Sequence, residues 1–221
     1  QGGFKLVEGS AWFERGRGRV RSFNDDIGLI VDNVWFKYPG SKPVLKGVNL
    51  VVHRGEITGI RGVNGVGKTT LLKIISGVLK PWKGRVVVYG KLSYVPENPL
   101  LYFTHPTPRG ELTSVSSSVD LIEDIIEYMG LRGVLDKPLA YLSSGERRRV
   151  ALASAFISGC DVILLDEPTG GLDRYSVEAI MDIIDRLSRK GVSFIIAHHD
   201  PRLNNLMDRD CVLDDGVLKC Q

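Results

Sequence analysis

Residues 62–69 have the spacing of a loop that binds phosphate. They read Gly-Val-Asn-Gly-Val-Gly-Lys-Thr and match the pattern G-x-x-x-x-G-K-[ST] in full. An apolar run over 57–60 precedes them, and apolar residues at helical spacing follow over 69–79. Backbone N–H groups of such a loop, together with the N-terminus of the following helix, surround a phosphate group. No Asp or Glu occurs from residue 57 to residue 96, so no charge nearby in the sequence opposes a polyphosphate.

The loop therefore predicts a nucleotide site, because a chance glycine-rich loop would need neither a strand before it nor a helix after it. Lys68 is expected to bridge the β- and γ-phosphates, and the Thr69 hydroxyl is expected to bind Mg²⁺. The residues expected to bind the nucleotide here are Gly62, Asn64, Gly65, Gly67, Lys68, Thr69 and Thr70.

A carboxylate pair could supply the chemistry of hydrolysis. The wholly apolar run 162–165 ends in Asp166 and Glu167. Ligands bind at the carboxyl ends of strands in open α/β sheets, so both side chains would lie at the ligand edge. Asp166 suits Mg²⁺ binding, and Glu167 suits polarising a water molecule for attack on the γ-phosphate. Alone, such a pair could be a strand end with no role; beside the phosphate loop it predicts hydrolysis.

Strands and helices alternate around these motifs. Apolar or β-branched runs predict strands, and apolar residues three to four positions apart predict helices. The expected strands are 29–31, 34–36, 44–52, 57–60, 85–89, 162–165 and 193–197, and the expected helices are 69–79, 119–129, 144–157 and 176–188. Residues 98–118 contain three prolines and a serine cluster, so we expect a loop there. The order predicts an α/β fold whose parallel sheet is covered on both faces.

Composition excludes several classes of protein. The 221 residues are 43% hydrophobic and 25% charged, which is ordinary for a globular chain, and no apolar run approaches the roughly 20 residues of a membrane-spanning helix. A net charge of +3 is too small to indicate nucleic-acid binding. The three cysteines lack metal-ligand spacing and argue against a disulfide framework. No apolar signal stretch opens the chain, so we expect a cytosolic protein.

Residues 1–27 differ from the rest and are expected to form an N-terminal appendage. Arginines alternate with glycine or valine at Arg15, Arg17, Arg19 and Arg21. One interpretation is a basic arm that touches nucleic acid or phospholipid. The other, a solvated strand or a poorly ordered terminus, is favoured because four arginines make a small patch.

Five further segments resemble motifs of the ATP-binding cassette (ABC) ATPases. Residues 142–146, Leu-Ser-Ser-Gly-Glu, resemble the signature motif, usually LSGGQ. Residues 171–173 resemble the D-loop, and His199-Asp200 resembles the segment of the switch histidine. Tyr38 resembles the aromatic residue that stacks on adenine, and residues 94–99 lie where the family has its Q-loop. The resemblance covers residues 28–221, in the order of the family.

The resemblance implies a P-loop NTPase (RecA-like) core with an antiparallel β subdomain and an α-helical subdomain, the latter at residues 98–141. It implies ATP and Mg²⁺ as cofactors, with Glu167, His199 and Glu97 as catalytic residues and Thr69, Asp166 and Glu97 near the metal. It also implies two subunits that enclose two ATP molecules. Each signature motif would then face the phosphate loop of the partner, and Ser143, Ser144, Gly145 and Asp173 would bind nucleotide.

Several of these residues have alternative interpretations. Tyr38 could pack locally as an aromatic residue at a strand end. Ser143 could merely cap the next helix, although a cap should not need Gly145 and Glu146 as well. His199 is favoured over His198, because Asp200 follows it and because neighbours along a strand point to opposite faces.

Departures from the family pattern are found at three positions. Ser144 and Glu146 stand where glycine and glutamine are common, and both changes are mild. Glu97 stands where the Q-loop has glutamine, and its charge would lie beside the γ-phosphate and Glu167. It could bind Mg²⁺ more strongly than glutamine, or the neighbouring carboxylates could favour its protonated form.

The resemblance implies the ATPase subunit of a transporter whose membrane subunits are separate proteins, contacted by the segment after Glu97. Residues 97–99, 101–103, 107–112 and 147–151 look like the ATPases of cobalt, nickel and vitamin importers of the energy-coupling-factor type. A homodimer or a heterodimer with a related subunit would lie on the cytoplasmic face of the membrane. The alternative is a soluble ABC ATPase, as in iron–sulfur cluster assembly. DNA-repair members are excluded by length, and a GTPase switch by the lack of N-K-x-D.

Residues 211–220 predict a β-hairpin, because Asp-Gly between apolar runs is a strong turn signal. A two-residue turn at Asp215-Gly216 would place Cys211 opposite Cys220 in a non-hydrogen-bonded pair, with Cα atoms about 4.5 Å apart. That distance is at the short end of disulfide geometry. A three-residue loop with a bulge would separate the two residues. In an ordinary cytosol we expect the pair to stay reduced, hyperthermophile cytosols being an exception.

Overall fold

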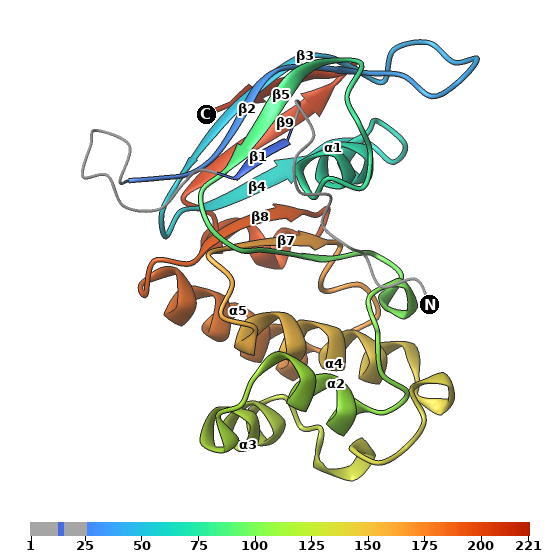
Figure 1. Cartoon of the computed structure of the whole chain (residues 1–221), viewed down its shortest axis with the longest axis vertical. Helices are drawn as coiled ribbons and strands as arrows, with labels where there is room; N and C mark the ends of the chain where they lie inside the picture. Colours follow the sequence, from blue (N-terminus) through green and yellow to red (C-terminus); the bar gives the residue numbers. More distant parts are fainter. Residues whose placement is uncertain (1–12, 16–25) are drawn as a thin grey trace.

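The computed structural model describes residues 13–15 and 26–221, and within them two β-sheets are surrounded by helices (Figure 1). The smaller sheet has the strand order β1 (Phe13–Arg15), β5 (Lys83–Val88), β2 (Ile27–Phe36), β3 (Leu45–His53). The larger sheet has the order β10 (Val217–Cys220), β9 (Arg209–Asp214), β4 (Ile57–Arg61), β8 (Ser193–Ala197), β7 (Val162–Asp166), β6 (Leu92–Val95). Neighbouring strands from β9 to β6 are parallel, and only β10 among these six is antiparallel.

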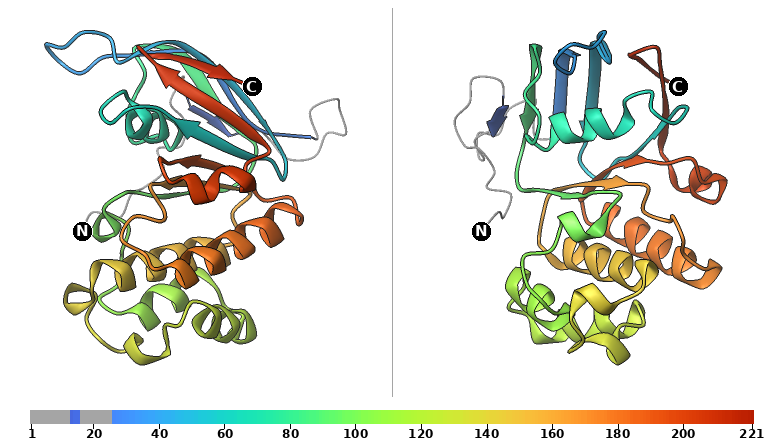
Figure 2. Two further views of the ribbon diagram at one scale, coloured as in Figure 1. Left: turned by 180° about the vertical axis from the view of Figure 1, so that it is seen from behind. Right: turned by 90° about the vertical axis from the view of Figure 1, so that its right-hand side faces the viewer.

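The larger sheet separates two hydrophobic cores. Val162 and Leu164 of β7 belong to one core, whereas Ile163 and Leu165 belong to the other, as alternation along a strand requires. The smaller sheet and α1 (Lys68–Ile75) lie on one side of the larger sheet, and α4 (Ser144–Ile157) and α5 (Arg174–Ser188) lie on the other (Figures 1 and 2). Both faces are covered, which is why β7 and β8 are buried along their whole length.

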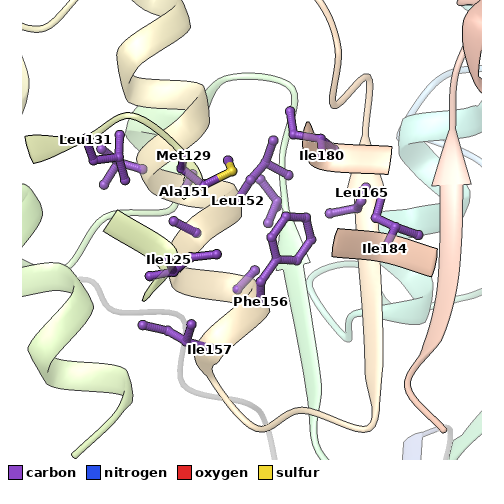
Figure 3. Close-up of a cluster of buried hydrophobic side chains, with 14 of the residues drawn as sticks. Ile125, Met129, Leu131, Ala151, Leu152, Phe156, Ile157, Leu165, Ile180 and Ile184 are labelled. Carbon is purple, nitrogen blue, oxygen red and sulfur yellow. The ribbon is translucent and has the colours of Figure 1, made fainter. Parts of the chain in front are cut away.

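The core on the α4 side extends beyond the sheet into a group of shorter helices. It packs α4 and α5 against α3 (Val119–Tyr128) and the loop after it; Ile125, Met129, Leu152 and Phe156 meet there (Figure 3). The segment expected to form the helical subdomain, 98–141, contains η1 (Pro99–Leu101), α2 (Pro108–Val115), α3, η2 (Arg132–Val134) and η3 (Leu139–Tyr141).

The expectation of a loop over 98–118 was wrong, because α2 lies within it. The Thr107 side chain accepts a hydrogen bond from the N–H of Gly110 at 3.3 Å, Pro108 occupies the first helical turn and Glu111 follows in that turn. A proline at the first helical position lacks an N–H that would have no partner there in any case. The prolines that suggested a loop therefore include the start of a helix.

Most other elements agree with the sequence-based expectations. Helix α4 and strand β8 have the expected bounds, and 29–31 and 34–36 join into β2 around Asn33, where φ is 49°. Helix α1 ends at Ile75 rather than at residue 79, because Gly77 has a φ of 82°. Strand β6 and η4 (Pro201–Leu206) were not expected.

The C-terminal hairpin has the predicted register. Cys220 pairs with Cys211, and Asp215 and Gly216 have φ angles of 42° and 79°, as a type I′ turn requires. The expectation of reduced thiols was wrong for this structure: Cys211 and Cys220 form a disulfide, with Cα atoms 3.9 Å apart. The register brings the two residues together across adjacent strands.

Two expectations concern the beginning of the chain and membrane insertion. Residues 13–15 form β1, which pairs in parallel with β5; Arg17, Arg19 and Arg21 lie outside the described residues. In the described part of the chain, no helix combines the length and the apolar character needed to span a membrane.

Candidate nucleotide-binding site

The predicted phosphate loop connects β4 to α1. Gly67 precedes the helix with a φ of 118°, no side chain caps the helix start, and its first turn contains no acidic residue. The N–H groups of that turn therefore have no side-chain acceptor and face an anion with favourable helix polarity. A Cβ added at Gly62, whose φ is 152°, would lie 2.5 Å from the Leu213 carbonyl oxygen, so only glycine fits there. Lys68 Nζ donates to the Gly62 carbonyl at 2.8 Å.

A cavity of about 380 Å³ opens beside this loop. It brings together residues of four sequence motifs, and its lining consists of Asn64, Gly65, Gly67, Lys68, Thr69, Thr70, Glu97, Glu167 and His199. All of these were predicted as site residues. The remaining candidates, Tyr38, Gly62, Ser143, Ser144, Gly145, Asp166 and Asp173, do not line it.

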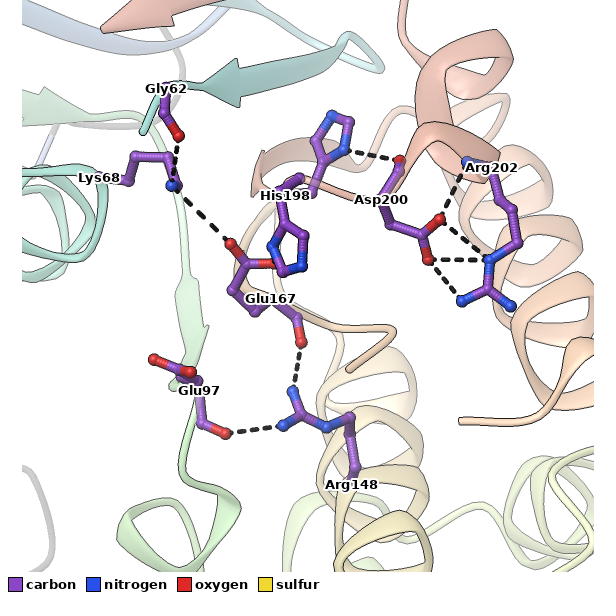
Figure 4. Close-up of polar contacts among 9 residues, drawn as sticks. Gly62, Lys68, Glu97, Arg148, Glu167, His198, Asp200 and Arg202 are labelled. Carbon is purple, nitrogen blue, oxygen red and sulfur yellow. Dashed lines mark hydrogen bonds and ion pairs between the residues drawn. The ribbon is translucent and has the colours of Figure 1, made fainter. Parts of the chain in front are cut away.

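Glu167 lies at the centre of the polar contacts in this cavity. Its Oε2 is 2.8 Å from Nδ1 of His199, and its Oε1 is 3.9 Å from Nζ of Lys68 (Figure 4). Its φ of 51° is unusual for a residue with a side chain, and such backbone strain is concentrated at functional sites. A carboxylate held between two cation-forming groups beside a phosphate loop is placed to accept a proton from water.

The two adjacent histidines have different environments. His199 is largely exposed and reaches Glu167, whereas His198 is fully buried and its Nδ1 lies 3.1 Å from the Asp200 carbonyl. Burial lowers the pKa of His198, because it disfavours the charged imidazolium. Alternation at the end of β8 therefore directs only His199 into the cavity.

Asp166 is buried, and its two carboxylate oxygens have different surroundings. The Tyr94 hydroxyl donates to Oδ2 at 3.2 Å, while Oδ1 has no hydrogen-bond partner among the described residues. Burial raises the pKa of Asp166, and the Thr69 and Tyr94 hydroxyls partly offset this. A buried carboxylate oxygen without a partner, next to the Thr69 hydroxyl, fits a hard divalent cation.

The same region excludes a metal site built from side chains alone. No group of three or more His, Cys, Asp or Glu with metal-binding geometry occurs among the described residues. Mg²⁺ commonly uses one or two protein ligands and takes the others from phosphate and water. The donor set therefore fits Mg²⁺ bound together with a nucleotide.

Arg148 joins two cavity residues through their backbones, and no role was predicted for it. From α4, its guanidinium donates to the Glu97 carbonyl at 3.0 Å and to the Glu167 carbonyl (Figure 4). Arg148 lies two positions after the signature-like segment, so the helix that begins there contacts both loops. Its place in a run of three arginines was the one available signal.

The contacts of Tyr38 fit both local packing and a ring that is left available for stacking on a base. Its hydroxyl lies 3.1 Å from Oγ1 of Thr70, and its ring packs edge-on against Phe36 with centroids 4.9 Å apart. It remains 40% exposed. The aromatic ring therefore packs locally and still keeps accessible surface near the start of α1.

The signature-like segment forms a helix cap, and one argument from the sequence was wrong. Ser143 Oγ accepts the Glu146 N–H at 3.2 Å, while Glu146 Oε2 accepts the Ser143 N–H at 2.7 Å. This capping box does use Glu146, contrary to the expectation that a cap would not. The Ser143 N–H also holds the pKa of Glu146 below its usual value. Asp173 caps α5 in a similar way, through Ser176 N at 2.9 Å.

The fold and the cavity together define a P-loop nucleotide hydrolase. The signature-like segment at the start of α4 lies outside this cavity, and Ser143 and Ser144 are exposed there. The family model for ABC transporters matches residues 45–170, which is more than half of the chain. The chain belongs to the ABC transporter ATP-binding family, and it is an ATPase of that family.

Curated relatives support this membership. The energy-coupling factor transporter ATP-binding protein EcfA of Methanocaldococcus jannaschii is 32% identical, over 84% of this chain and 75% of its own length. EcfA of Methanothermobacter thermautotrophicus is also 32% identical, over 83% of this chain and 67% of its own. Some relatives are longer: the chain spans 40% of a Bacillus cereus relative that is 32% identical.

Solved structures have the same fold. The structure of cbiO1 from Clostridium perfringens, part of the ABC transporter complex cbiONQ, has a TM-score of 0.71 at 30% identity and covers 88% of both chains. A dimeric post-hydrolysis state of the ATP-binding cassette MJ0796, bound to ADP and Pi, has a TM-score of 0.77 at 25% identity, over 87% of this chain and 97% of that one.

Proposed function

We propose that the chain binds Mg²⁺ and ATP, closes on a second ATPase subunit and uses hydrolysis to drive transport through separate membrane subunits. One observation supports the proposed dimer. The cavity contains Lys68, Glu167 and His199, but Ser143, Gly145 and Asp173 of the same chain do not line it. Two copies of the chain, or this chain with a related subunit, would bring a signature segment to each cavity.

Each of these residues would have a separate role in ATP hydrolysis. Lys68 neutralises charge on the phosphates, and the N–H groups at the start of α1 bind their oxygens. Thr69 and Asp166 hold Mg²⁺, which supplies further charge neutralisation when bound. Glu167 accepts the proton of the attacking water, and His199 fixes the orientation of Glu167 through their 2.8 Å contact. Glu97, which lines the same cavity, would offer a further carboxylate oxygen to the metal or the water.

The transporter class we propose is the energy-coupling-factor type. It is supported by the named EcfA relatives and by cbiO1, and also by the resemblance around residues 97–112. In this assignment the chain is peripheral on the cytoplasmic face of the membrane, and the cargo is a metal ion or a vitamin. Co-expression with membrane subunits of an energy-coupling-factor transporter should yield a complex that purifies through a tag on this chain. Purification with iron–sulfur assembly partners instead would contradict the class.

The dimer is tested with Glu167→Gln, which keeps the shape of the side chain and removes the base. We expect monomers without nucleotide and dimers with Mg²⁺ and ATP, measured by size-exclusion chromatography with light scattering. Adding Gly145→Asp should abolish the dimer, because it places a carboxylate at the outward-facing helix start. A Cβ there meets Leu172 and Gly171 at 3.5 and 3.6 Å, which its own chain tolerates.

The matched control is Gly133→Asp, because a Cβ at Gly133 meets nothing within 4 Å. This variant adds the same charge away from the cap and should dimerise like Glu167→Gln alone. ATP-bound protein that stays monomeric at micromolar concentrations would contradict the sandwich arrangement.

A further inference from the structure

Tyr94 lies on β6, next to the strand that ends in Asp166. The two strands are parallel, with Tyr94 opposite Leu164 and Val95 opposite Leu165. This register places the tyrosine ring within reach of the carboxylate that follows Leu165, although 72 residues separate the two in sequence. The ring packs against the core on the α1 side of the sheet, so its position is fixed by apolar contacts.

The Tyr94 hydroxyl makes the two carboxylate oxygens of Asp166 different, because it bonds only one of them. It donates to Oδ2 at 3.2 Å. Oδ1 is left buried and without a partner. Without the Tyr94 hydroxyl, Oδ2 would lose the hydrogen bond that holds it, and the carboxylate could rotate about its Cβ–Cγ bond.

We propose that Tyr94 is a positioning residue for Mg²⁺, which holds Asp166 by one oxygen so that the other is presented to the metal. The inference rests on the proposed binding of Mg²⁺ with ATP and assigns a function to a residue that was not among the candidate site residues. Hydrogen-bond partners of metal-binding groups generally fix ligand orientation, and their loss costs about 10- to 100-fold in metal affinity.

The test compares Tyr94→Phe with Tyr102→Phe. Each removes one partly buried hydroxyl, but that of Tyr102 contacts Ser93 and Ser154 rather than Asp166. A fluorescent, non-hydrolysable ATP analogue is titrated at rising Mg²⁺ concentration and again in EDTA. For Tyr94→Phe we expect the Mg²⁺ concentration at half-maximal binding to rise about tenfold, the lower end of that range, with binding in EDTA unchanged. Tyr102→Phe should match the parent.

Tyr94→Leu is the second variant. It also removes the hydroxyl, but it replaces the aromatic ring with a branched aliphatic side chain. Both should shift the Mg²⁺ midpoint alike, and thermal unfolding should confirm that both are folded. An unshifted midpoint in Tyr94→Phe, a shift in Tyr94→Leu alone, or equal weakening in EDTA would overturn the inference. A parent protein whose analogue binding ignores Mg²⁺ would overturn the proposed metal site as well, which separates the two failures.

Discussion

Opening the Cys211–Cys220 bridge is expected to destabilise the chain while leaving the nucleotide cavity intact. Cys220→Ser is the suitable change, because Cys220 is exposed whereas Cys211 is fully buried in the core. The bridge closes a loop with a sequence separation of 9 residues. For a loop of that length, the chain-entropy relation gives about 2.6 kcal/mol at 25 °C. With about 2.1 cal/mol/K of unfolding entropy per residue, the midpoint of thermal unfolding should fall by about 6 °C.

Calorimetry of the parent and of Cys220→Ser, each with and without a phosphine reductant, measures this effect. The reductant should lower the midpoint of the parent to that of the variant and leave the variant unchanged. Alkylation of the denatured parent should modify one cysteine before reduction and three after it. Equal midpoints in all four samples would show that the type I′ turn already closes this loop in the unfolded chain, which would refute the entropy argument.

Substitutions in and beside the cavity give four further predictions. Glu167→Gln should lower kcat about 100- to 1,000-fold in a phosphate-release assay, with unchanged ATP affinity; parental turnover would exclude it as the base. Lys68→Ala should weaken binding of labelled ATP, and unaltered affinity would count against the phosphate loop. Glu97→Gln should keep kcat within about tenfold, so a collapse would make the carboxylate essential. Arg148→Gln leaves two carbonyls without their donor and should cost about 1–3 kcal/mol in urea unfolding, whereas Arg189→Gln, which loses only an exposed ion pair with Asp185, should cost less.

Features that depend on neighbours in sequence could be predicted from the sequence. The phosphate loop, the α4 bounds and the hairpin register all follow from residues within about ten positions of one another. The choice of His199 over His198 followed from Asp200, which comes directly after it, and from the alternation of side chains along a strand. Local rules failed where one residue type has two uses: Pro108 was interpreted as a loop residue, although proline also opens helices.

Features that depend on strand order could not be predicted. Tyr94 and Asp166 are 72 residues apart, and Arg148 and the Glu97 carbonyl are 51 apart. Their contacts exist because β6 lies beside β7 and because α4 packs across the ends of both. No periodicity within one segment specifies that arrangement, so neither Tyr94 nor Arg148 was among the predicted site residues.

The capping box at α4 has a consequence for the entropy of association. The Ser143 hydroxyl oxygen accepts the Glu146 N–H, and the Glu146 carboxylate accepts the Ser143 N–H. The rotamer of this serine is therefore fixed before any second subunit arrives. Immobilising a free side chain at an interface costs roughly 0.5–1.5 kcal/mol, and a preorganised one avoids that loss. Glutamate at position 146 thus orders the Ser143 side chain in advance of the proposed dimer.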